Sequence, residues 1–196
     1  MRQRLVRILL IVLVVLLNIG CDQVTKVIAR NTLRGRGTVR VVGETFVLRY
    51  VENEGAFLSF GSGWPTWARR LFLMGGPAVL VIVLLVYVFW TKEIRTVHLV
   101  AYCCIIGGGL SNLIDRLIYG GRVTDFMNLG IGNLRTGIFN VADLSVLFGA
   151  GLLLFTLGFR RRTAEKAHDG GKDGKQSGEE TNGGLENKGD REDRPQ

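Results

Sequence analysis

The chain has 196 residues, of which 47% are hydrophobic, and its mean hydropathy is +0.23. This composition is too apolar for an ordinary soluble domain, and the length suits a single domain. The net charge is +8, yet the last 34 residues hold six Lys/Arg against nine Asp/Glu, so the positive charge belongs to the remainder. There the basic residues flank apolar runs, which points to membrane lipids and away from nucleic acid as the partner.

The first apolar stretch covers residues 5–28, with an uninterrupted apolar run at 8–17. A helix needs about 20 such residues to cross roughly 30 Å of hydrocarbon, so this stretch predicts a first membrane span. The connection that follows predicts a small β-hairpin, because apolar residues alternate partly with polar ones on both sides of a turn at residues 43–44. The alternating apolar residues are Val39, Val41, Phe46, Leu48 and Tyr50.

Three further apolar stretches, at residues 67–90, 97–119 and 138–159, predict the second, third and fourth spans. Tryptophan occurs only at the two ends of the second stretch, as in an aromatic belt at the membrane interfaces. Within that stretch, the glycines and proline at residues 75–77 predict a kink.

The last segment, residues 163–196, has almost no aliphatic content and predicts a disordered, charged cytoplasmic tail. We therefore expect a mainly α membrane protein in which residues 1–162 form one domain of four transmembrane helices. A small extracytoplasmic β-hairpin is expected between the first and second helices. Basic residues near the start of the chain, in the turn at 91–96 and at 160–162 favour a cytoplasmic location for both termini.

Ahead of the tail the chain has only eight acids, and four of them are aspartates in or beside apolar spans. Charged groups at membrane depth cost about 2.5–3.5 kcal/mol each on insertion scales, so these aspartates indicate function. Alternate threading of the four spans collects them, with several amide and basic side chains, on the extracytoplasmic face. The collected residues are Asp22, Lys26, Asn53, Asn112, Asp115, Arg116, Asp125, Asn140 and Asp143, with Asp125 in a short loop and Asn53 in the hairpin region.

Structural interpretations remain open for some of these residues. Asp22 and Lys26 lie four residues apart, which also suits a simple interfacial ion pair. Asp115 and Arg116 also suit snorkelling charges at a helix end. Asp143 resists such an interpretation, because apolar residues flank it on both sides within the expected fourth span.

Two neighbouring carboxyl groups can share one proton, because like charges in proximity raise one pKa, and the pair then serves water as base and acid. Asp125 and Asp143 are the pair we expect, since a short loop and the start of a span can bring them together. A serine or cysteine hydrolase would need a histidine as general base. Neither histidine is suitably placed, because His98 lies at the opposite end of its span and His168 lies in the tail. No HExxH or comparable metal-ligand motif is present.

Five motifs carry a resemblance to a known family across about residues 10–158. In this order, and in these positions relative to four spans, they resemble the lipoprotein signal peptidases, the signal peptidase II family of aspartyl membrane peptidases. The chain departs from the family at Ser111, where Gly is common, at Thr124, where an aliphatic residue is usual, and in its long tail. The motifs are Asp22 with Lys26, Asn53-Glu54-Gly55-Ala56-Phe57, Asn112-Leu113-Ile114-Asp115-Arg116, Val123-Thr124-Asp125-Phe126 and Phe139-Asn140-Val141-Ala142-Asp143.

The resemblance implies an aspartic endopeptidase of the bacterial inner membrane that cuts diacylglyceryl-modified prolipoproteins immediately before the lipidated cysteine. It implies that Asp125 and Asp143 form the catalytic dyad near the extracytoplasmic face, with no metal or other cofactor. We expect the protein to act as a monomer. The residues to which the resemblance assigns substrate binding or support of the site are Asp22, Lys26, Asn53, Gly55, Asn112, Asp115, Arg116 and Asn140.

Two other interpretations compete with this one. Residues 2–21 look somewhat like a lipoprotein signal peptide ending at Cys21, but Asn18 is large for a lipobox position and the charges that follow are then unexplained. A small transporter or channel would also use buried charges, but near the bilayer midplane, where the expected spans are aliphatic apart from Cys and Gly. The three cysteines, with no CxxC pair and no histidine at metal spacing, predict neither a disulfide framework nor a zinc site.

Overall fold

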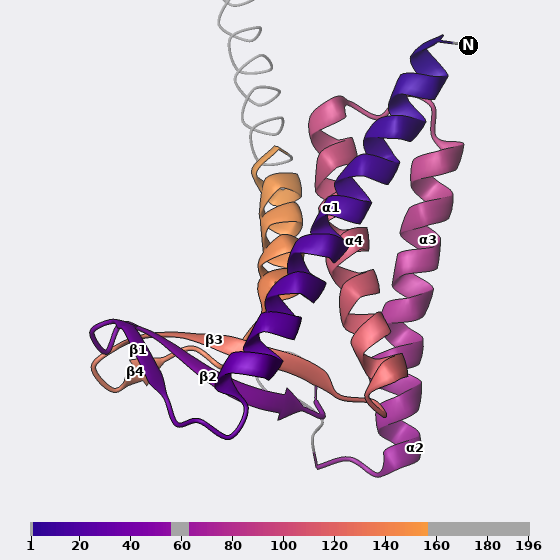
Figure 1. Cartoon of the computed structure of the whole chain (residues 1–196). Coiled ribbons are helices and arrows are strands. Elements are labelled where there is room, and N and C mark those ends of the chain that lie inside the picture. The colour runs from indigo at the N-terminus through magenta and orange to yellow at the C-terminus, as the bar shows by residue number, and fades with distance from the viewer. Residues whose placement is uncertain (1, 56–62, 157–196) are drawn as a thin grey trace, which may run out of the picture. The chain divides into compact units, whose positions relative to one another are not determined.

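The computed structural model describes residues 2–55 and 63–156 (Figure 1). The predicted tail at 163–196 and the end of the motif that follows Asn53 lie outside the described residues. Within the described part, apolar helices form a bundle and an antiparallel sheet lies at one end of it (Figure 1). This is the membrane protein of mainly α class that the sequence predicts.

The first helix, α1, spans Arg2–Leu33 and is longer than the predicted span at 5–28. Its last turns bury Ala29 and Leu33 against Phe126 of the sheet, so packing continues the helix beyond the apolar run. The helix thereby links the membrane bundle to the sheet.

The second span is continuous over Thr66–Trp90 and has three parts: α2 (Thr66–Arg69), η2 (Arg70–Gly75) and α3 (Gly76–Trp90). The π-helical turn η2 ends at Gly75, the first residue of the segment at 75–77 where the sequence predicts a kink. A proline inside a helix lacks an N–H donor and its ring meets the carbonyl four residues earlier, and a π-turn ahead of Pro77 accommodates both.

The third span, α4 (Thr96–Ile118), agrees with its prediction to within one residue and is the most buried of the helices long enough to cross a membrane. Its small residues admit close neighbours. A Cβ atom added at Gly108 of α4 would lie 2.5 Å from the carbonyl oxygen of Ala142 in the neighbouring helix. One added at Gly149 of that helix would lie 2.5 Å from the carbonyl oxygen of Ala101 in α4. Small residues of this kind let transmembrane helices approach with their backbones almost in contact.

The fourth apolar helix is described as Val141–Thr156. Three helices in the described part are long and apolar enough to cross a membrane, and this shorter one continues to the end of that part. It begins three residues later than predicted, because Phe139 pairs with Met127 of the sheet and its backbone is therefore extended. Asp143 consequently lies in the first turn of the helix and not inside a long apolar run.

Four antiparallel strands form the sheet in the order β1 (Val39–Val42), β2 (Phe46–Asn53), β3 (Val123–Ile131) and β4 (Leu134–Arg135). The predicted hairpin is confirmed as β1 and β2. The prediction that Asp125 lies in a short loop is wrong, because it lies within β3 and opposite Val51 of β2. Residues 123–126 are all buried, so this strand shows no alternation that its sequence could reveal.

Candidate active site

Asp125 lies near the start of β3, with only 2% of its surface exposed. Each of its carboxyl oxygens accepts a hydrogen bond from an amide side chain. Asn53, the last residue of β2, donates from Nδ2 to Oδ2 at 2.8 Å, and Asn140 donates from Nδ2 to Oδ1 at 2.6 Å. The pairing of β2 with β3 brings Asn53 to Asp125 across 72 positions of sequence.

Asp143 is fixed by the start of the fourth helix. The backbone N–H of Asp143 donates to Oδ1 of Asn140 at 3.0 Å, and the N–H of Asn140 donates back to Oδ2 of Asp143 at 3.2 Å. This reciprocal pair is a capping box, which satisfies two N–H groups that a helix start leaves open. The second carboxyl oxygen of Asp143 accepts from Nδ2 of Asn112 at 3.0 Å.

Asn140 and Asn112 connect the two aspartates. Asn140 Nδ2 donates both to Asp125 and, at 3.1 Å, to Oδ1 of Asn112, whose own amide nitrogen donates to Asp143. The chain of contacts therefore runs from one carboxyl to the other through two amides. The sequence prediction that these four residues lie close together agrees with this geometry.

The environment of Asp125 changes its acidity. Burial, and after it the nearby charge of Asp143, raise the pKa of the Asp125 carboxyl to about 7, although hydrogen bonds from Asn53 and Asn140 oppose the shift. Burial disfavours the charged form, and a second acid in proximity does the same. A pKa of about 7 lets Asp125 change its protonation state near neutral pH.

Lys26 lies behind the amides and is fully buried, as are the acids around it. Its Nζ lies 2.7 Å from Oδ2 of Asp22 and 3.2 Å from Oδ2 of Asp115, and it donates to Oδ1 of Asn112 at 2.9 Å. Because Oδ1 of Asn112 faces the ammonium, the amide nitrogen of Asn112 faces Asp143. Lys26 thus fixes the orientation of the amide that contacts Asp143.

The structure decides between the two interpretations left open for the flanking charges. Asp22 and Lys26 have no exposed surface, so they are not a solvated interfacial pair. Asp115 is likewise fully buried, and its Oδ2 accepts from the backbone N–H of Thr124 at 3.0 Å, which ties α4 to β3. Arg116 is 7% exposed, so neither of these two residues is a snorkelling end charge.

Sequence reasoning missed several polar residues that complete this network. Gln23 donates to Oδ1 of Asp115 at 3.0 Å and to Oγ of Ser111 at 2.9 Å, and Ser111 donates to Asp22 at 2.7 Å. Arg30 donates to Oγ1 of Thr124 at 2.6 Å. The two departures from the family pattern, Ser111 and Thr124, are therefore additional hydrogen-bonding groups. Positions 22, 23, 26 and 30 share one face of a helix, and that polar stripe was the available signal.

Arg116 extends from α4 toward the end of β2. One of its Nη atoms donates to the carbonyl oxygen of Gly55 at 3.0 Å. Its Nε is buried and has no hydrogen-bond partner in the described part of the chain. A buried donor without a partner is costly, so this atom is suited to a group that a ligand would bring.

A cavity of about 470 Å³ opens beside Asn112, Arg116 and Asp143. Its remaining walls are apolar or small and come from α3, α4 and the fourth helix. Its shape therefore combines a polar end at the candidate site with an apolar groove between helices. The apolar walls are Gly76, Pro77, Leu80, Val81, Ile105, Gly109, Val146, Leu147 and Ala150.

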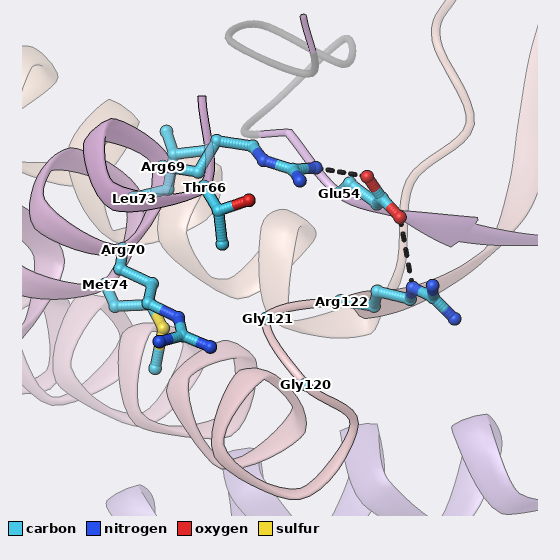
Figure 2. Close-up of a pocket in the computed structure, with 9 residues that line it drawn as sticks. All are labelled: Glu54, Thr66, Arg69, Arg70, Leu73, Met74, Gly120, Gly121 and Arg122. Atoms are coloured by element: carbon cyan, nitrogen blue, oxygen red, sulfur yellow. Dashed lines mark hydrogen bonds and ion pairs between the residues drawn. The ribbon is translucent and has the colours of Figure 1, made fainter. Parts of the chain in front are cut away.

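Glu54 lies between two residues that contact the site, Asn53 and Gly55, and its side chain points away into a second cavity of about 130 Å³ (Figure 2). There it bridges Arg69 of α2 and Arg122, with Oε1 3.1 Å from Nε of Arg122 (Figure 2). The hydrogen bond from Arg69 holds the pKa of the Glu54 carboxyl below its usual range. The segment that carries Asn53 is thus tied to the second span and to the start of β3.

Among the described residues, no group of three or more His, Cys, Asp or Glu side chains is arranged to hold a metal ion. The carboxyl groups of Asp125 and Asp143 accept hydrogen bonds from amide side chains, and Asp143 also accepts one from the backbone N–H of Asn140. Such an arrangement suits proton exchange with a bound water and a polarised carbonyl.

Comparison with known proteins supports one family. The family model described as signal peptidase (SPase) II matches residues 13–159. A lipoprotein signal peptidase of Pelodictyon phaeoclathratiforme is 36% identical over 150 residues, covering 72% of this chain and 85% of that protein. One from Treponema denticola is 32% identical over 148 residues, with coverage of 72% and 86%.

A solved structure described as a bacterial membrane enzyme has the same fold. It aligns with a TM-score of 0.64 and 26% sequence identity, covering 75% of this chain and 86% of that chain. The apolar helices place the protein in a membrane. The chain belongs to the signal peptidase II family, the lipoprotein signal peptidases that remove signal peptides from prolipoproteins.

Proposed function

We propose that Asp125 and Asp143 are the catalytic dyad of an aspartic endopeptidase that cuts diacylglyceryl-modified prolipoproteins immediately before the lipidated cysteine. The observation that carries this proposal is the amide connection between the two carboxyl groups through Asn140 and Asn112. It holds two acids side by side, one of which has a pKa of about 7. Two acids so arranged share a proton near neutral pH.

In the proposed mechanism the ionised acid of the dyad takes a proton from a water molecule as its oxygen attacks the scissile carbonyl carbon. The protonated acid donates a hydrogen bond to the carbonyl oxygen and stabilises the negative charge that develops there. The tetrahedral intermediate then collapses, the peptide C–N bond breaks, and the proton taken from water passes to the leaving nitrogen of the cysteine. The amides of Asn53, Asn112 and Asn140 hold the carboxyl groups in position throughout.

The apolar groove beside Asp143 supports a lipid-bearing substrate. Acyl chains of a diacylglyceryl group would lie along the apolar walls of the 470 Å³ cavity while the peptide crosses its polar end. The unpartnered Nε of Arg116 would then donate to a backbone or ester carbonyl of the substrate. Asp22, Lys26 and Asp115 support the site from behind, and Gly55 offers its carbonyl to Arg116.

The protein would work as a monomer, since every group proposed for the reaction comes from one chain. Its termini would lie in the cytoplasm and its site near the extracytoplasmic face of the inner membrane, as the basic flanks of the spans favour. Residues 1–162 would form the peptidase domain and residues 163–196 a charged tail.

The test is cleavage by the purified protein of one precursor with and without its diacylglyceryl group. The wild type should cut only the lipidated form, before the cysteine. Asp125→Asn and Asp143→Asn should each abolish cleavage, because Asn is nearly isosteric but exchanges no proton, and the double variant should be hardly worse than either single variant.

Expression, membrane insertion and thermal stability of the Asn variants are measured in parallel, since each aspartate also makes structural hydrogen bonds. Asp115→Asn serves as the comparison for removing a buried carboxylate outside the dyad, and it should retain more activity. Substantial lipid-dependent cleavage by either well-folded dyad variant would refute the aspartic mechanism. Equal cleavage of both precursors by the wild type would refute lipid recognition and leave the aspartic mechanism standing.

A further inference from the structure

A third cavity lies at the end of the bundle away from the candidate active site. It has a volume of about 440 Å³ and is lined by the first turns of α1 and the last turn of α3. Its inner wall contains Ile11 and Val88, which are 3% and 0% exposed. Its outer edges contain Ile8 and Phe89, which are 36% and 54% exposed. The groove therefore has a buried apolar floor and exposed apolar edges.

The rim of the same groove is basic. Arg4, Arg7 and Lys92 line it, and no acidic residue does. Arg4 and Lys92 are exposed, and among the described residues their side chains make no hydrogen bond or ion pair. The one acid nearby in sequence, Glu93, is exposed and does not line the groove.

Arg7 has a different role from the other two basic residues. Its guanidinium donates to the carbonyl oxygens of Val88, Thr91 and Lys92 at 2.6, 2.5 and 2.6 Å. The last carbonyls of a helix lack partners within the helix and carry its negative dipole end, so Arg7 satisfies and offsets them. Within the described residues, the charges of Arg4 and Lys92 are thus unpaired.

We propose that this groove binds an anionic glycerophospholipid. Its phosphodiester lies between Arg4 and Lys92, and an acyl chain follows Ile8 and Phe89. Basic pockets between transmembrane helices favour anionic headgroups, and guanidinium and ammonium groups form charge-assisted hydrogen bonds to phosphate oxygens. A zwitterionic lipid would bring a cation to a rim that already holds three, and a small soluble anion would leave the apolar wall unused.

The site is separate from the proposed catalytic one. The groove beside Asp143 reaches along α3 from Gly76 to Val81, whereas this groove begins at Val88. Seven residues of helix separate the two, or about 10 Å at 1.5 Å per residue. A lipid at the rim would join the start of α1 to the end of α3, where the guanidinium of Arg7 already donates to carbonyl oxygens at the end of α3.

The proposal is tested by photocrosslinking the full chain in phosphatidylcholine bilayers with photoactivatable phosphatidylglycerol, then mapping the labelled residues by mass spectrometry. Labelling should concentrate at residues 4–11 and 88–92 and exceed that by the matching phosphatidylcholine probe. In an Arg4→Gln/Lys92→Gln variant the apparent affinity at these residues should fall roughly thirty-fold, because two basic groups near the lipid surface are removed. Cleavage of prolipoprotein should be unchanged.

The matched control is Arg36→Gln/Arg49→Gln, which removes two exposed arginines at the sheet end of the molecule and should leave labelling intact. Equal loss in that control would mean that net charge and not the groove attracts the lipid, and would overturn the proposal. Equal labelling by the two probes would overturn it as well. Displacement by glycerol 3-phosphate as effective as by phosphatidylglycerol would show a soluble-anion site instead of a lipid site.

Discussion

Asp125 differs from an ordinary surface aspartate in both its burial and its partners. Two amides donate to its two oxygens, and its pKa nevertheless stands at about 7, since burial and the neighbouring acid outweigh those hydrogen bonds. By donating to the carboxylate, the amides stabilise its ionised form, so Asp125 can still ionise although it is buried. At the residue scale, the environment therefore prepares this carboxyl to change its protonation state near neutral pH.

The pH dependence of cleavage should report this carboxyl. With a pKa raised to about 7, the pair loses its shared proton as pH rises through that value, so kcat/KM should decline above about pH 7. In Asn53→Ala, the loss of a hydrogen bond to the ionised form raises the pKa further, and the declining limb should move to higher pH. Initial rates at subsaturating substrate across the pH range measure both. A limb that stays in place or moves down in Asn53→Ala would contradict the assignment.

The polar residues that collect at one end of the bundle were predictable because charge at membrane depth is rare and conspicuous. Alternate threading alone brought Lys26, Asn112 and Asp143 to one region, where they form a single network. Gln23 and Ser111 were not predicted, since neutral polar residues near helix ends are common and only their partners reveal their role. Contacts decide that role, and contacts between α1 and α4 depend on how the helices pack.

At the scale of elements, the bridge from Glu54 to Arg69 and Arg122 joins the second span to the sheet (Figure 2). Glu54→Gln keeps the size of the side chain and removes its charge, so the segment carrying Asn53 and Gly55 should lose its restraint. We expect a several-fold fall in kcat/KM with little change in melting temperature, because exposed ion pairs contribute little to stability. Kinetics and thermal unfolding of the purified variant measure the two effects.

Glu44→Gln is the matched control for that variant, because Glu44 pairs with Arg40 on the same sheet but far along the strands from Asn53. It should cleave at the wild-type rate. A charge-reversed double variant, Glu54→Arg with Arg69→Glu, is a second comparison. It should restore part of the cleavage activity that is lost when the ion pair between these residues is removed. An activity of Glu54→Gln equal to the wild type would mean that the bridge has no part in positioning the site.

Close helix packing predicts a second effect at this scale. A Cβ atom at Gly108 would meet the carbonyl oxygen of Ala142 at 2.5 Å, so Gly108→Ala should push α4 from the fourth helix and separate Asn112 from Asp143. Overpacking of this kind costs about 1–3 kcal/mol. Melting temperature and cleavage should both fall. Gly151→Ala, where nothing lies within 4 Å of the added atom, should change neither, and equal effects of the two would refute the packing argument.

The elements themselves were predicted unevenly. The apolar runs gave the helices to within a few residues, since hydropathy alone specifies a membrane span. Strand β3 was not predicted, because it is buried through residues 123–126 and its hydrogen-bonding partner β2 lies about 70 positions earlier in the chain. The start of the fourth helix was displaced for a similar reason, since Phe139 pairs with the same strand. The local periodicity of a segment does not indicate which distant segment it pairs with.

At the scale of the whole molecule, the proposed reaction requires none of the last 34 residues. All of its groups lie between Asp22 and Asp143, so truncation after Arg162 should leave turnover unchanged. Cleavage by the truncated and full-length proteins, normalised to the amount inserted in the membrane, measures this. A large loss of turnover in a truncated protein that inserts normally would assign the tail a regulatory or docking role.

The candidate site is assembled from segments spread along most of the chain. Lys26 comes from the first helix, Asn53 from the strand after it, Asp125 from β3 and Asp143 from the last apolar helix. On the proposed assignment, a nascent chain therefore carries no working dyad until its last helix has entered the membrane. An incompletely inserted polypeptide would be unable to cut any protein, including others emerging beside it, so peptidase activity would begin only after the helix that carries Asp143 is in place.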